Sequence, residues 1–285
     1  MRQYLELLAD VLENGSHRAV TPQGTGDISV FVRQKEYPVR LDAFPILTTK
    51  KIYFHGIVVE LLWFLSGESR WDFLHRHGVH FWDEWGTKEV AALYGLEEGD
   101  LGPIYGPNWI HWPNRKGGEL NQIARLVEEL RRSPGSRRHK VMAFDPTAVI
   151  AYDPAAIDDV MVAPCHGNFK CYVNLETSEL HLHMVQRSAD VPIGVPFNIT
   201  SYALLLAMLA QVTDLKPGTF IHTTEDTHVY LNQIEPVRLQ LERGPHPLPR
   251  LKMNDKVRDI FAFKPDDFEL EGYDPHPFIK IPVGI

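Results

Sequence analysis

Apolar and polar positions follow two different periods along this chain. Apolar residues three and four positions apart, as in Ile123, Leu126 and Val127, predict amphipathic helices. Helices are expected over residues 2–14, 53–66, 70–77, 119–132 and 197–213. Alternation and β-branched residues predict strands over residues 28–32, 140–144, 168–173, 179–185 and 216–222. Because these elements do not follow a strict βαβ order, the pattern favours an α+β fold over a doubly wound parallel sheet.

Length and composition bound the organisation of the chain. With 285 residues, 44% of them hydrophobic and 23% charged, the chain has enough apolar surface for one large core. We therefore expect one domain over residues 1–285, with a variable insertion around residues 86–102. Proline-rich stretches at 245–249 and 274–282 predict surface turns.

Charge and cysteine content exclude several classes of protein. A net charge of −8 disfavours DNA binding, which needs a basic surface to displace counterions. The start of the chain, with Glu6 and Asp10, is typical of an amphipathic helix rather than a signal peptide, and no run of 18 apolar residues occurs. Two cysteines, Cys165 and Cys171, are too few for a disulfide framework and lack the paired spacing of a zinc site. We expect a cytoplasmic protein without membrane contact and without a metal.

Cys165, beside His166, is the first candidate for chemistry. A thiol reacts as the thiolate, and a nearby arginine or histidine, here Arg187 or His166, would lower its pKa. The alternative is a buried structural cysteine, the commoner role for an isolated cysteine. Cys171, in the middle of a predicted strand, fits that alternative.

Arg137, Arg138 and Arg187 form a second candidate group. The first two follow the helix predicted over 119–132, and Arg187 follows the strand predicted over 179–185. All three side chains could meet at one rim and hold a phosphate through paired hydrogen bonds. For Arg137 and Arg138 the alternative is a solvated charge pair.

Glu60 stands in an almost wholly apolar helical run, residues 59–65. An ionised carboxylate is costly in such surroundings unless it has a partner. Burial raises a carboxyl pKa toward the range of a general acid or base, which indicates proton handling. A structural hydrogen bond inside the core is the alternative.

Three further segments carry side chains suited to a flat ligand and a sugar. Trp82 and Trp85 either wall a heteroaromatic ring or fill core. Asn198, at the head of a long apolar helix, is either an N-cap or a donor to a base edge. His228 and Tyr230, two apart, share one side of an extended segment and could bond a sugar hydroxyl, unless the segment is simply a surface strand.

In sequence order, these segments resemble the folate-dependent thymidylate synthase family, whose nucleophile is a cysteine. The shared segments cover nearly the whole chain, at residues 24–26, 44–45, 48–50, 60–65, 82–85, 99–106, 136–138, 163–166, 186–190, 196–198, 226–230 and 272–277. The resemblance implies the thymidylate synthase fold, a mixed β-sheet flanked by helices, with the sheets of two subunits packed back to back in a homodimer.

The resemblance also implies a reaction. Cys165 would add to C6 of the uracil ring of dUMP, a pyrimidine nucleoside monophosphate, with 5,10-methylenetetrahydrofolate as donor of carbon and hydride. Glu60 would carry proton transfers through ordered water, and Tyr105 would assist at C5. The catalytic residues implied by the resemblance are Cys165, Glu60, Tyr105, His166, Arg187 and Asp190.

Binding roles follow from the same resemblance. Arg187 and Ser188 would hold the phosphate, Asn198 would read O4 and N3 of the base, and His228 with Tyr230 would bond the 3′-hydroxyl. Arg137 and Arg138 would reach the phosphate site of the other subunit. The implied nucleotide-binding residues are Arg137, Arg138, Arg187, Ser188, Asn198, Asp226, His228 and Tyr230. The implied folate-binding residues are Phe81, Trp82, Trp85, Asp190, Gly194, Phe197 and Ile285.

Departures from the family pattern leave a rival open. Pro22 stands where the family carries a phosphate-binding arginine, and Arg18 is the nearest substitute. Altered phosphate binding is expected of a pyrimidine nucleotide 5-hydroxymethylase, which would act on dUMP, dCMP or CMP. Asn198, where hydroxymethylases of the dCMP type have aspartate, favours the synthase. A binding protein without catalysis is disfavoured because Cys165, Glu60, Arg187 and Asp226 are all present.

Overall fold

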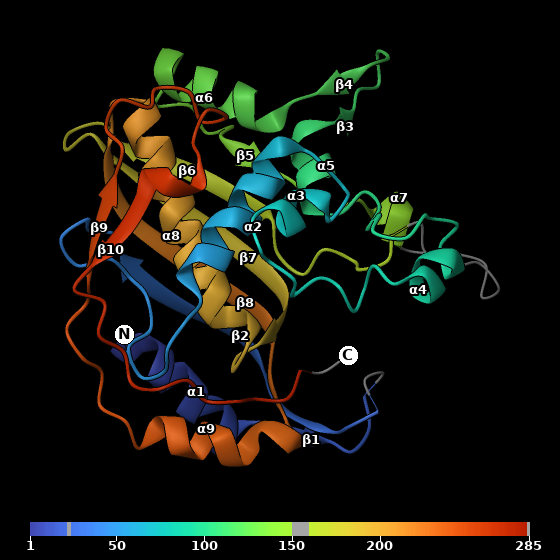
Figure 1. Ribbon diagram of the computed structural model, residues 1–285. Coiled ribbons are helices and arrows are strands. Elements are labelled where there is room, and N and C mark those ends of the chain that lie inside the picture. The colour runs from blue at the N-terminus through green and yellow to red at the C-terminus, as the bar shows by residue number, and fades with distance from the viewer. Residues whose placement is uncertain (22–23, 150–159, 284–285) are drawn as a thin grey trace.

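A six-stranded mixed sheet organises the protein, whose computed structural model describes residues 1–21, 24–149 and 160–283 (Figure 1). Its strand order is β1-β2-β8-β7-β6-β5, antiparallel throughout except for the parallel pair β7 and β8. The strands are β1 (Ser16–Arg18), β2 (Asp27–Pro38), β5 (Lys140–Val141), β6 (Asn168–Asn174), β7 (Glu179–Asp190) and β8 (Lys216–Tyr230). Two small sheets pair β3 (Trp112–Pro113) with β4 (Glu119–Leu120) and β9 (Arg250–Met253) with β10 (Phe268–Glu271). The predicted α+β class is confirmed.

Helices pack against this sheet. They are α1 (Arg2–Asn14), α2 (Phe54–Ser66), α3 (Asp72–Arg76), α4 (Lys88–Leu93), α5 (Tyr105–Ile110), α6 (Gln122–Arg132), α7 (Pro146–Val149), α8 (Gly194–Val212) and α9 (Ile234–Leu241). Short 3₁₀ turns occur at η1 (Leu231–Gln233) and η2 (Pro265–Asp267). Helix α1 packs on β2 through one apolar face, and α9 lies beside it (Figure 1).

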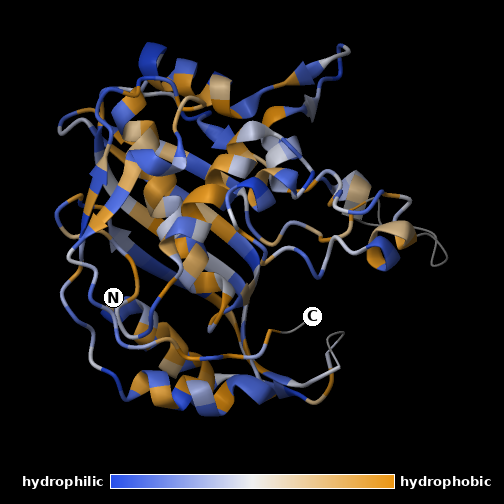
Figure 2. Cartoon of the chain, viewed as in Figure 1, coloured by the Kyte–Doolittle hydropathy of each residue, from blue (hydrophilic) through white to orange (hydrophobic). Residues whose placement is uncertain are grey.

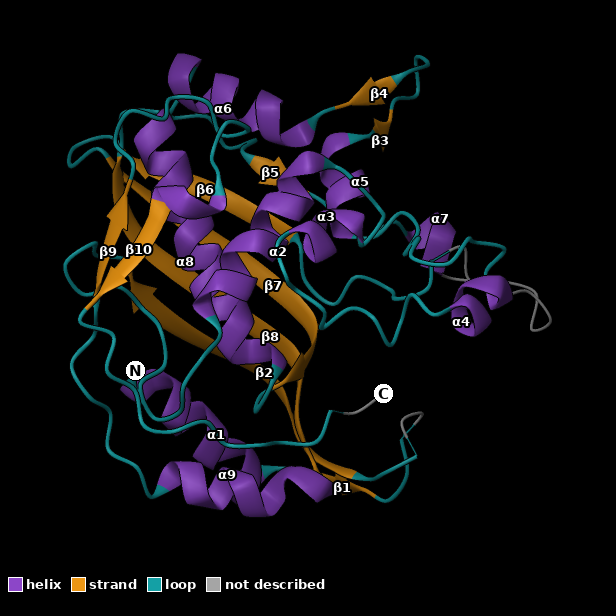
Figure 3. Cartoon of the chain, in the orientation of Figure 1, coloured by secondary structure: helices purple, strands orange, loops and turns teal. Residues whose placement is uncertain are grey.

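Helix α8 is the centre of the core. It packs on β7 and β8, α2 packs on α8, and both helices lie in front of the strands in Figure 3. Its residues are apolar nearly all round, as the hydropathy colours show (Figure 2), and a helix of that pattern is stable only when buried. By length and composition α8 would also suit a membrane span, but 89% of its apolar 18-residue segment is buried inside the protein. It is therefore read as a core helix.

The other face of the sheet is only half covered. In β6, Phe169, Cys171 and Val173 are buried, while Tyr172, between the last two, is 64% exposed. Tyr172 pairs across the strands with His181 of β7, which is partly exposed on the same face. Within the described residues of one chain, this face of the sheet thus has no second layer. The buried Cys171 has the structural role that the sequence indicated.

Most predicted elements are present, but several have different ends. Helices 2–14, 53–66 and 197–213 are confirmed as α1, α2 and α8, and the strands at 28–32, 168–173, 179–185 and 216–222 as β2, β6, β7 and β8. Three of these strands run further than expected, β2 to Pro38, β7 to Asp190 and β8 to Tyr230. The strand expected over 140–144 was too long, because the N–H groups of Ala143 and Phe144 donate to Asn168 Oδ1 and leave the ladder. The helix expected over 119–132 begins only at Gln122, since Asn121 caps it. The helix expected over 70–77 shortens to α3.

The insertion and the C-terminal stretch are more ordered than the sequence indicated. Residues 86–102 contain α4, capped by Thr87, and a backbone hydrogen bond from Gly99 N–H to the Gly86 carbonyl closes the loop at 2.9 Å. The stretch 274–282 was expected to be a surface turn, yet Ile279 and Ile281 are buried. Their burial corrects that expectation and places the end of the described chain beside the cavities discussed next.

Candidate active site

A cavity of about 430 Å³ lies where α2, α8 and the ends of β7 and β8 meet. It brings together residues from segments far apart in the sequence. Its lining includes Glu60, Phe81, Trp82, Trp85, Tyr105, Cys165, His166, Ser188, Asp190, Gly194, Phe197, Asn198, His228 and Tyr230, all of which the sequence singled out, with Val162, Gln186, Ile193 and Val283. Aromatic walls with a few convergent polar groups are typical of a small-molecule site.

Strand register places two of the motifs side by side. In the parallel pair β7 and β8, Ser188 lies opposite Asp226, and Asp190 lies opposite His228. Because alternate residues of a strand point to one face, Ser188 and Asp190 point the same way, as do Asp226, His228 and Tyr230. The expectation that His228 and Tyr230 share one side of a strand is confirmed.

The turn that carries Cys165 is held by backbone contacts. The Cys165 N–H donates to the Tyr105 hydroxyl at 3.1 Å, and the Cys165 carbonyl accepts the Arg187 N–H at 2.8 Å. Gly167 follows with a φ of +100°, and a Cβ there would lie 2.5 Å from Ala143. Glycine is therefore required immediately after His166, and it fixes the position of the thiol.

The Cys165 thiol is not activated in the way that the sequence indicated. Arg187 Nη2 lies 3.7 Å from the sulfur, as expected, and its charge lowers the thiol pKa. Burial has the larger effect, so the pKa of Cys165 is raised overall. In the free protein the sulfur is thus a neutral thiol at neutral pH.

His166 does not act on the thiol either. Its Nδ1 lies 2.9 Å from the Tyr202 hydroxyl, and its ring stacks on Tyr105 with centroids 4.3 Å apart. Burial lowers the pKa of His166 to about 3, so the ring stays neutral. The expected contribution of His166 to the field at Cys165 is therefore wrong, and its contacts are those of a residue that orders its neighbours.

Glu60 fits both interpretations of its sequence. The Trp82 indole N–H donates to Glu60 Oε1 at 2.7 Å, which is a structural hydrogen bond. Burial raises the pKa of Glu60 to about 7, while the Trp82 bond opposes the rise. A carboxyl with that pKa exchanges protons readily at neutral pH.

Asn198 lies inside α8 and is not its N-cap. The helix begins at Gly194, so Asn198 stands on its second turn. Its Oδ1 is buried and finds no hydrogen-bond partner among the described residues. A buried amide oxygen without a partner is costly, and this one lines the cavity, where a ligand N–H would satisfy it. The N-cap alternative is therefore wrong, and the recognition alternative remains.

A charged network surrounds His228 at the lining of the cavity. His228 Nδ1 lies 3.1 Å from Asp226 Oδ1, and Arg18 contacts both oxygens of Asp226 at 2.7 and 2.8 Å. Arg18 also holds both oxygens of the buried Asp27 at 2.7 Å. Burial would raise the pKa of Asp226, but the Arg18 hydrogen bonds and the neighbouring charges lower it overall. Arg18, engaged by two carboxylates, is not poised as the substitute phosphate ligand that the sequence left open; Pro22 lies outside the described residues.

The three arginines do not meet at one rim within a single chain. Arg187 reaches the Cys165 turn, donating to the carbonyls of Ala163 and Pro164. Arg137 and Arg138 are exposed, and Arg138 lines a different cavity next to α6. The expectation of a common rim formed by one chain is therefore wrong.

The aromatic wall continues into a second cavity of about 800 Å³. Trp82 and Trp85 have ring centroids 5.5 Å apart, and Phe81 meets Phe197 edge to face at 5.8 Å. The two cavities share Phe81, Ile193, Phe197 and Val283. Together they suit an elongated ligand with a flat ring at one end; Ile285 lies outside the described residues.

Asp190 is the carboxylate at this wall. It accepts hydrogen bonds from the Ile193 N–H and from Gln233 Nε2, both at 3.1 Å. Burial raises its pKa, against the effect of those bonds. An acceptor set into an aromatic wall can orient the N–H groups of a flat heterocycle.

Sequence reasoning gave no role to two buried polar residues. Gln186 donates to the Ser188 carbonyl at 3.0 Å, and its Oε1 lies 2.9 Å from His222 Nε2. Lys50 donates to the Pro192 carbonyl at 2.5 Å, and burial lowers its pKa to about 8. Both stand in segments shared with the family, at 186–190 and 48–50, and that was the available signal.

Comparison with known families is consistent with this geometry. A family model described as "Thymidylate synthase" matches residues 2–285, essentially the whole chain.

Proposed function

Because the chain belongs to the thymidylate synthase family, whose members are one-carbon transferases, we propose that it converts dUMP to dTMP with 5,10-methylenetetrahydrofolate. One observation carries the proposal. The Cys165 thiol, the Glu60 carboxyl and the unpaired amide oxygen of Asn198 line a single cavity with aromatic walls.

The thiol is the proposed nucleophile. Cys165 bonds to C6 of the uracil ring, the displaced electron pair moves toward C5 and O4, and the thiol proton passes to solvent or a neighbouring base. Arg187, 3.7 Å from the sulfur, stabilises the thiolate as it forms. Because burial raises the thiol pKa, the sulfur is protonated before the nucleotide is bound and loses its proton as the bond to C6 forms.

Base and sugar recognition follow from the polar lining. We assign Asn198 to N3 and O4 of uracil. Its Oδ1 needs a donor, which is the N3–H of the base, and its amide N–H₂ donates to O4. His228 and Tyr230 bond the 3′-hydroxyl, and Asp226 holds the His228 ring at 3.1 Å. Arg187 and Ser188 hold the phosphate.

Proton transfers are assigned to the buried groups. Glu60, with a pKa of about 7, exchanges protons with the base through water. Tyr105 keeps its proton, because burial raises its pKa well above the usual value, and it assists at C5 as a hydrogen-bonding group. His166 orders Tyr105 by stacking.

The folate is assigned to the aromatic wall and the adjoining cavity. When bound, 5,10-methylenetetrahydrofolate supplies the methylene carbon and the hydride. Phe81, Trp82, Trp85 and Phe197 offer faces for a flat ring, Asp190 accepts from its N–H groups, and Gly194 opens α8 beside it. The residues present therefore fit such a group. Ile285 stays a prediction.

We also propose a homodimer in the cytoplasm. The half-exposed sheet face around Tyr172 offers a surface for back-to-back packing of two sheets. Arg137 and Arg138 are exposed and outside their own chain's cavity, which supports a contribution to the partner's phosphate site.

A 5-hydroxymethylase is the second candidate. The residues expected at the phosphate favour this candidate. Pro22 stands where the family has an arginine, and Arg18 is engaged by Asp27 and Asp226. In such an enzyme water captures the methylene in place of hydride.

Product analysis tests both candidates. The protein is incubated with 5,10-methylenetetrahydrofolate and each of dUMP, UMP, dCMP and CMP, dihydrofolate absorbance is followed, and products are identified by mass spectrometry. We expect a methylated product from dUMP with one dihydrofolate per turnover, and none with Cys165→Ala. A hydroxymethylated product without dihydrofolate would instead establish the second candidate, and no product from any nucleotide would refute both.

A further inference from the structure

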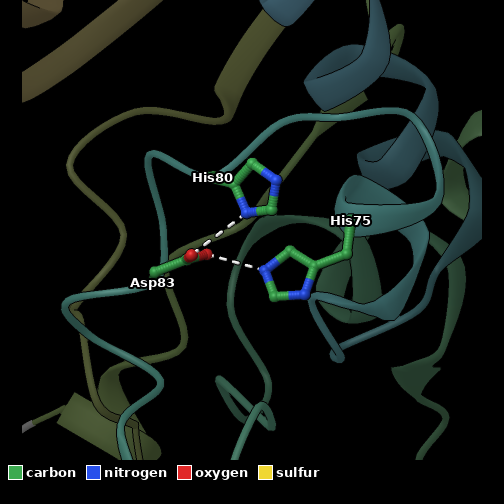
Figure 4. Close-up of side chains that lie close together, drawn as sticks. All are labelled: His75, His80 and Asp83. Atoms are coloured by element: carbon green, nitrogen blue, oxygen red, sulfur yellow. Dashed lines mark hydrogen bonds and ion pairs between the residues drawn. The ribbon is translucent and has the colours of Figure 1, made fainter.

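A cluster outside the cavity has no part in the proposed chemistry. His75, His80 and Asp83 each offer one ligand atom, and these atoms lie within 4.8 Å of one another. His75 Nε2 is 2.7 Å from Asp83 Oδ1, and His80 Nδ1 is 3.1 Å from Asp83 Oδ2 (Figure 4). None of the three lines the cavity that contains Cys165.

The local fold brings these residues together. Helix α3 ends at Arg76, and Gly78, with a φ of +71°, reverses the chain. The Val79 N–H donates to the Leu74 carbonyl at 3.0 Å, and both side chains are fully buried, so the reversal is anchored in the core. His80 therefore faces back toward His75.

A second turn and a stack complete the arrangement. The Asp83 N–H donates to the His80 carbonyl at 3.1 Å, and the Asp83 carboxylate contacts a nitrogen of both rings (Figure 4). The His75 ring stacks on Trp71, with centroids 4.9 Å apart and planes at 25°. The rings of His75 and His80 are 4.7 Å apart. Three ligands held in this way need little reorganisation on binding a cation.

We propose that His75, His80 and Asp83 form a zinc-binding site. Two imidazole nitrogens and a carboxylate oxygen are ligands that Zn²⁺ prefers, and three protein ligands leave a fourth position for water. Zinc–ligand bonds are about 2.0–2.2 Å, so a small retreat of the Asp83 oxygens admits the ion and replaces both His–Asp hydrogen bonds. The side chains are 33%, 61% and 41% exposed, so the ion has direct access from solvent.

This proposal departs from the expectation of no metal, which considered only cysteine spacing, and it does not depend on the proposed function. It gives the site a consequence for the cavity. Asp83 follows Trp82, whose indole bonds Glu60, and it precedes Trp85 of the aromatic wall. A bound ion would therefore restrain the segment that carries both tryptophans.

Zinc titration of the purified full-length chain tests the site. Isothermal calorimetry with Zn²⁺, and the visible spectrum with Co²⁺ in its place, are recorded for the unchanged protein and for His80→Ala. We expect one ion per chain in the unchanged protein and a loss of affinity of at least about 10-fold in His80→Ala, the scale known even for groups that only support a ligand. His80 is largely exposed, so the variant should fold, and its thermal midpoint without metal is measured to show this.

Two variants separate this site from other zinc binding. His77→Ala removes a histidine of the same segment that is outside the cluster, and it should bind as the unchanged protein does. Cys165→Ser removes the cavity thiol and should also leave zinc affinity unchanged. Equal affinity in His80→Ala and the unchanged protein, or loss of binding in Cys165→Ser, would overturn the proposal.

Discussion

The buried carboxyl of Glu60 makes the stability of this protein depend on pH. Glu60 is 9% exposed, stands in the apolar helix α2, and accepts one hydrogen bond, from Trp82. Replacing Glu60 with Gln keeps the size of the side chain and the acceptor for Trp82, and it removes the charge. We therefore expect Glu60→Gln to be more stable than the unchanged protein at neutral pH, although it should lose activity.

The size of the effect follows from the shifted pKa. The pKa of Glu60 is about 7 in the folded chain against an ordinary value of 4.5. The folded state thus holds the extra proton between these values, and stability is lost as pH rises through them. At 1.36 kcal/mol for each of about 2.5 pH units, the full loss is about 3 kcal/mol. About 2 kcal/mol of it should develop between pH 5 and pH 7.

Urea unfolding at pH 5 and pH 7, at one fixed protein concentration, measures the effect. The difference in free energy of unfolding between Glu60→Gln and the unchanged protein should grow in favour of the variant by about 2 kcal/mol over that interval. Glu84→Gln, which removes an exposed carboxylate beside Trp85, controls for the loss of a charge alone. A Glu60→Gln difference that is the same at both pH values would refute the argument from burial.

Three further predictions concern the cavity. Cys165→Ser should abolish turnover while calorimetry still detects dUMP binding; substantial residual turnover would rule out a covalent step. Asn198→Asp should raise kcat/KM for cytosine nucleotides relative to uracil nucleotides, and an unaltered ratio would show that another group reads the base. Arg18→Met should raise the KM for dUMP by roughly 5-fold, since a partly exposed ion pair contributes about 1 kcal/mol. The kcat should change little, because Asp226 positions His228 without touching the reacting carbon. An unchanged KM would mean that His228 is held without Arg18.

The sequence predicted the cavity well because its residues lie in short, ordered segments. The two-residue spacing put His228 and Tyr230 on one side of an extended segment, and the helical period placed Glu60 and Asn198 in apolar helices. Those two periods, with the resemblance to the family, brought nearly all the lining residues together before any geometry was known.

The sequence could not predict which side chains pair, because pairing depends on how distant segments approach each other in the fold. Arg18 meets Asp226 only because β1 and β8 both lie beside β2 in the sheet. His166 pairs with the Tyr202 hydroxyl of α8, a contact that its place next to Cys165 in the sequence does not indicate. The His75 and His80 rings face each other only because Gly78 reverses the chain.

The electrostatics of the cavity give a physical reason for a site to which two subunits contribute. Arg187 is the cation that lowers the Cys165 pKa, and it is also the proposed phosphate ligand. A nucleotide phosphate brings negative charge to the same guanidinium and offsets its effect at the sulfur. Arg137 and Arg138, exposed in their own chain, would restore positive charge if they reached that phosphate from the partner subunit. On this argument, assembly of the proposed homodimer and activation of the thiol are coupled, because burial alone leaves the thiol protonated.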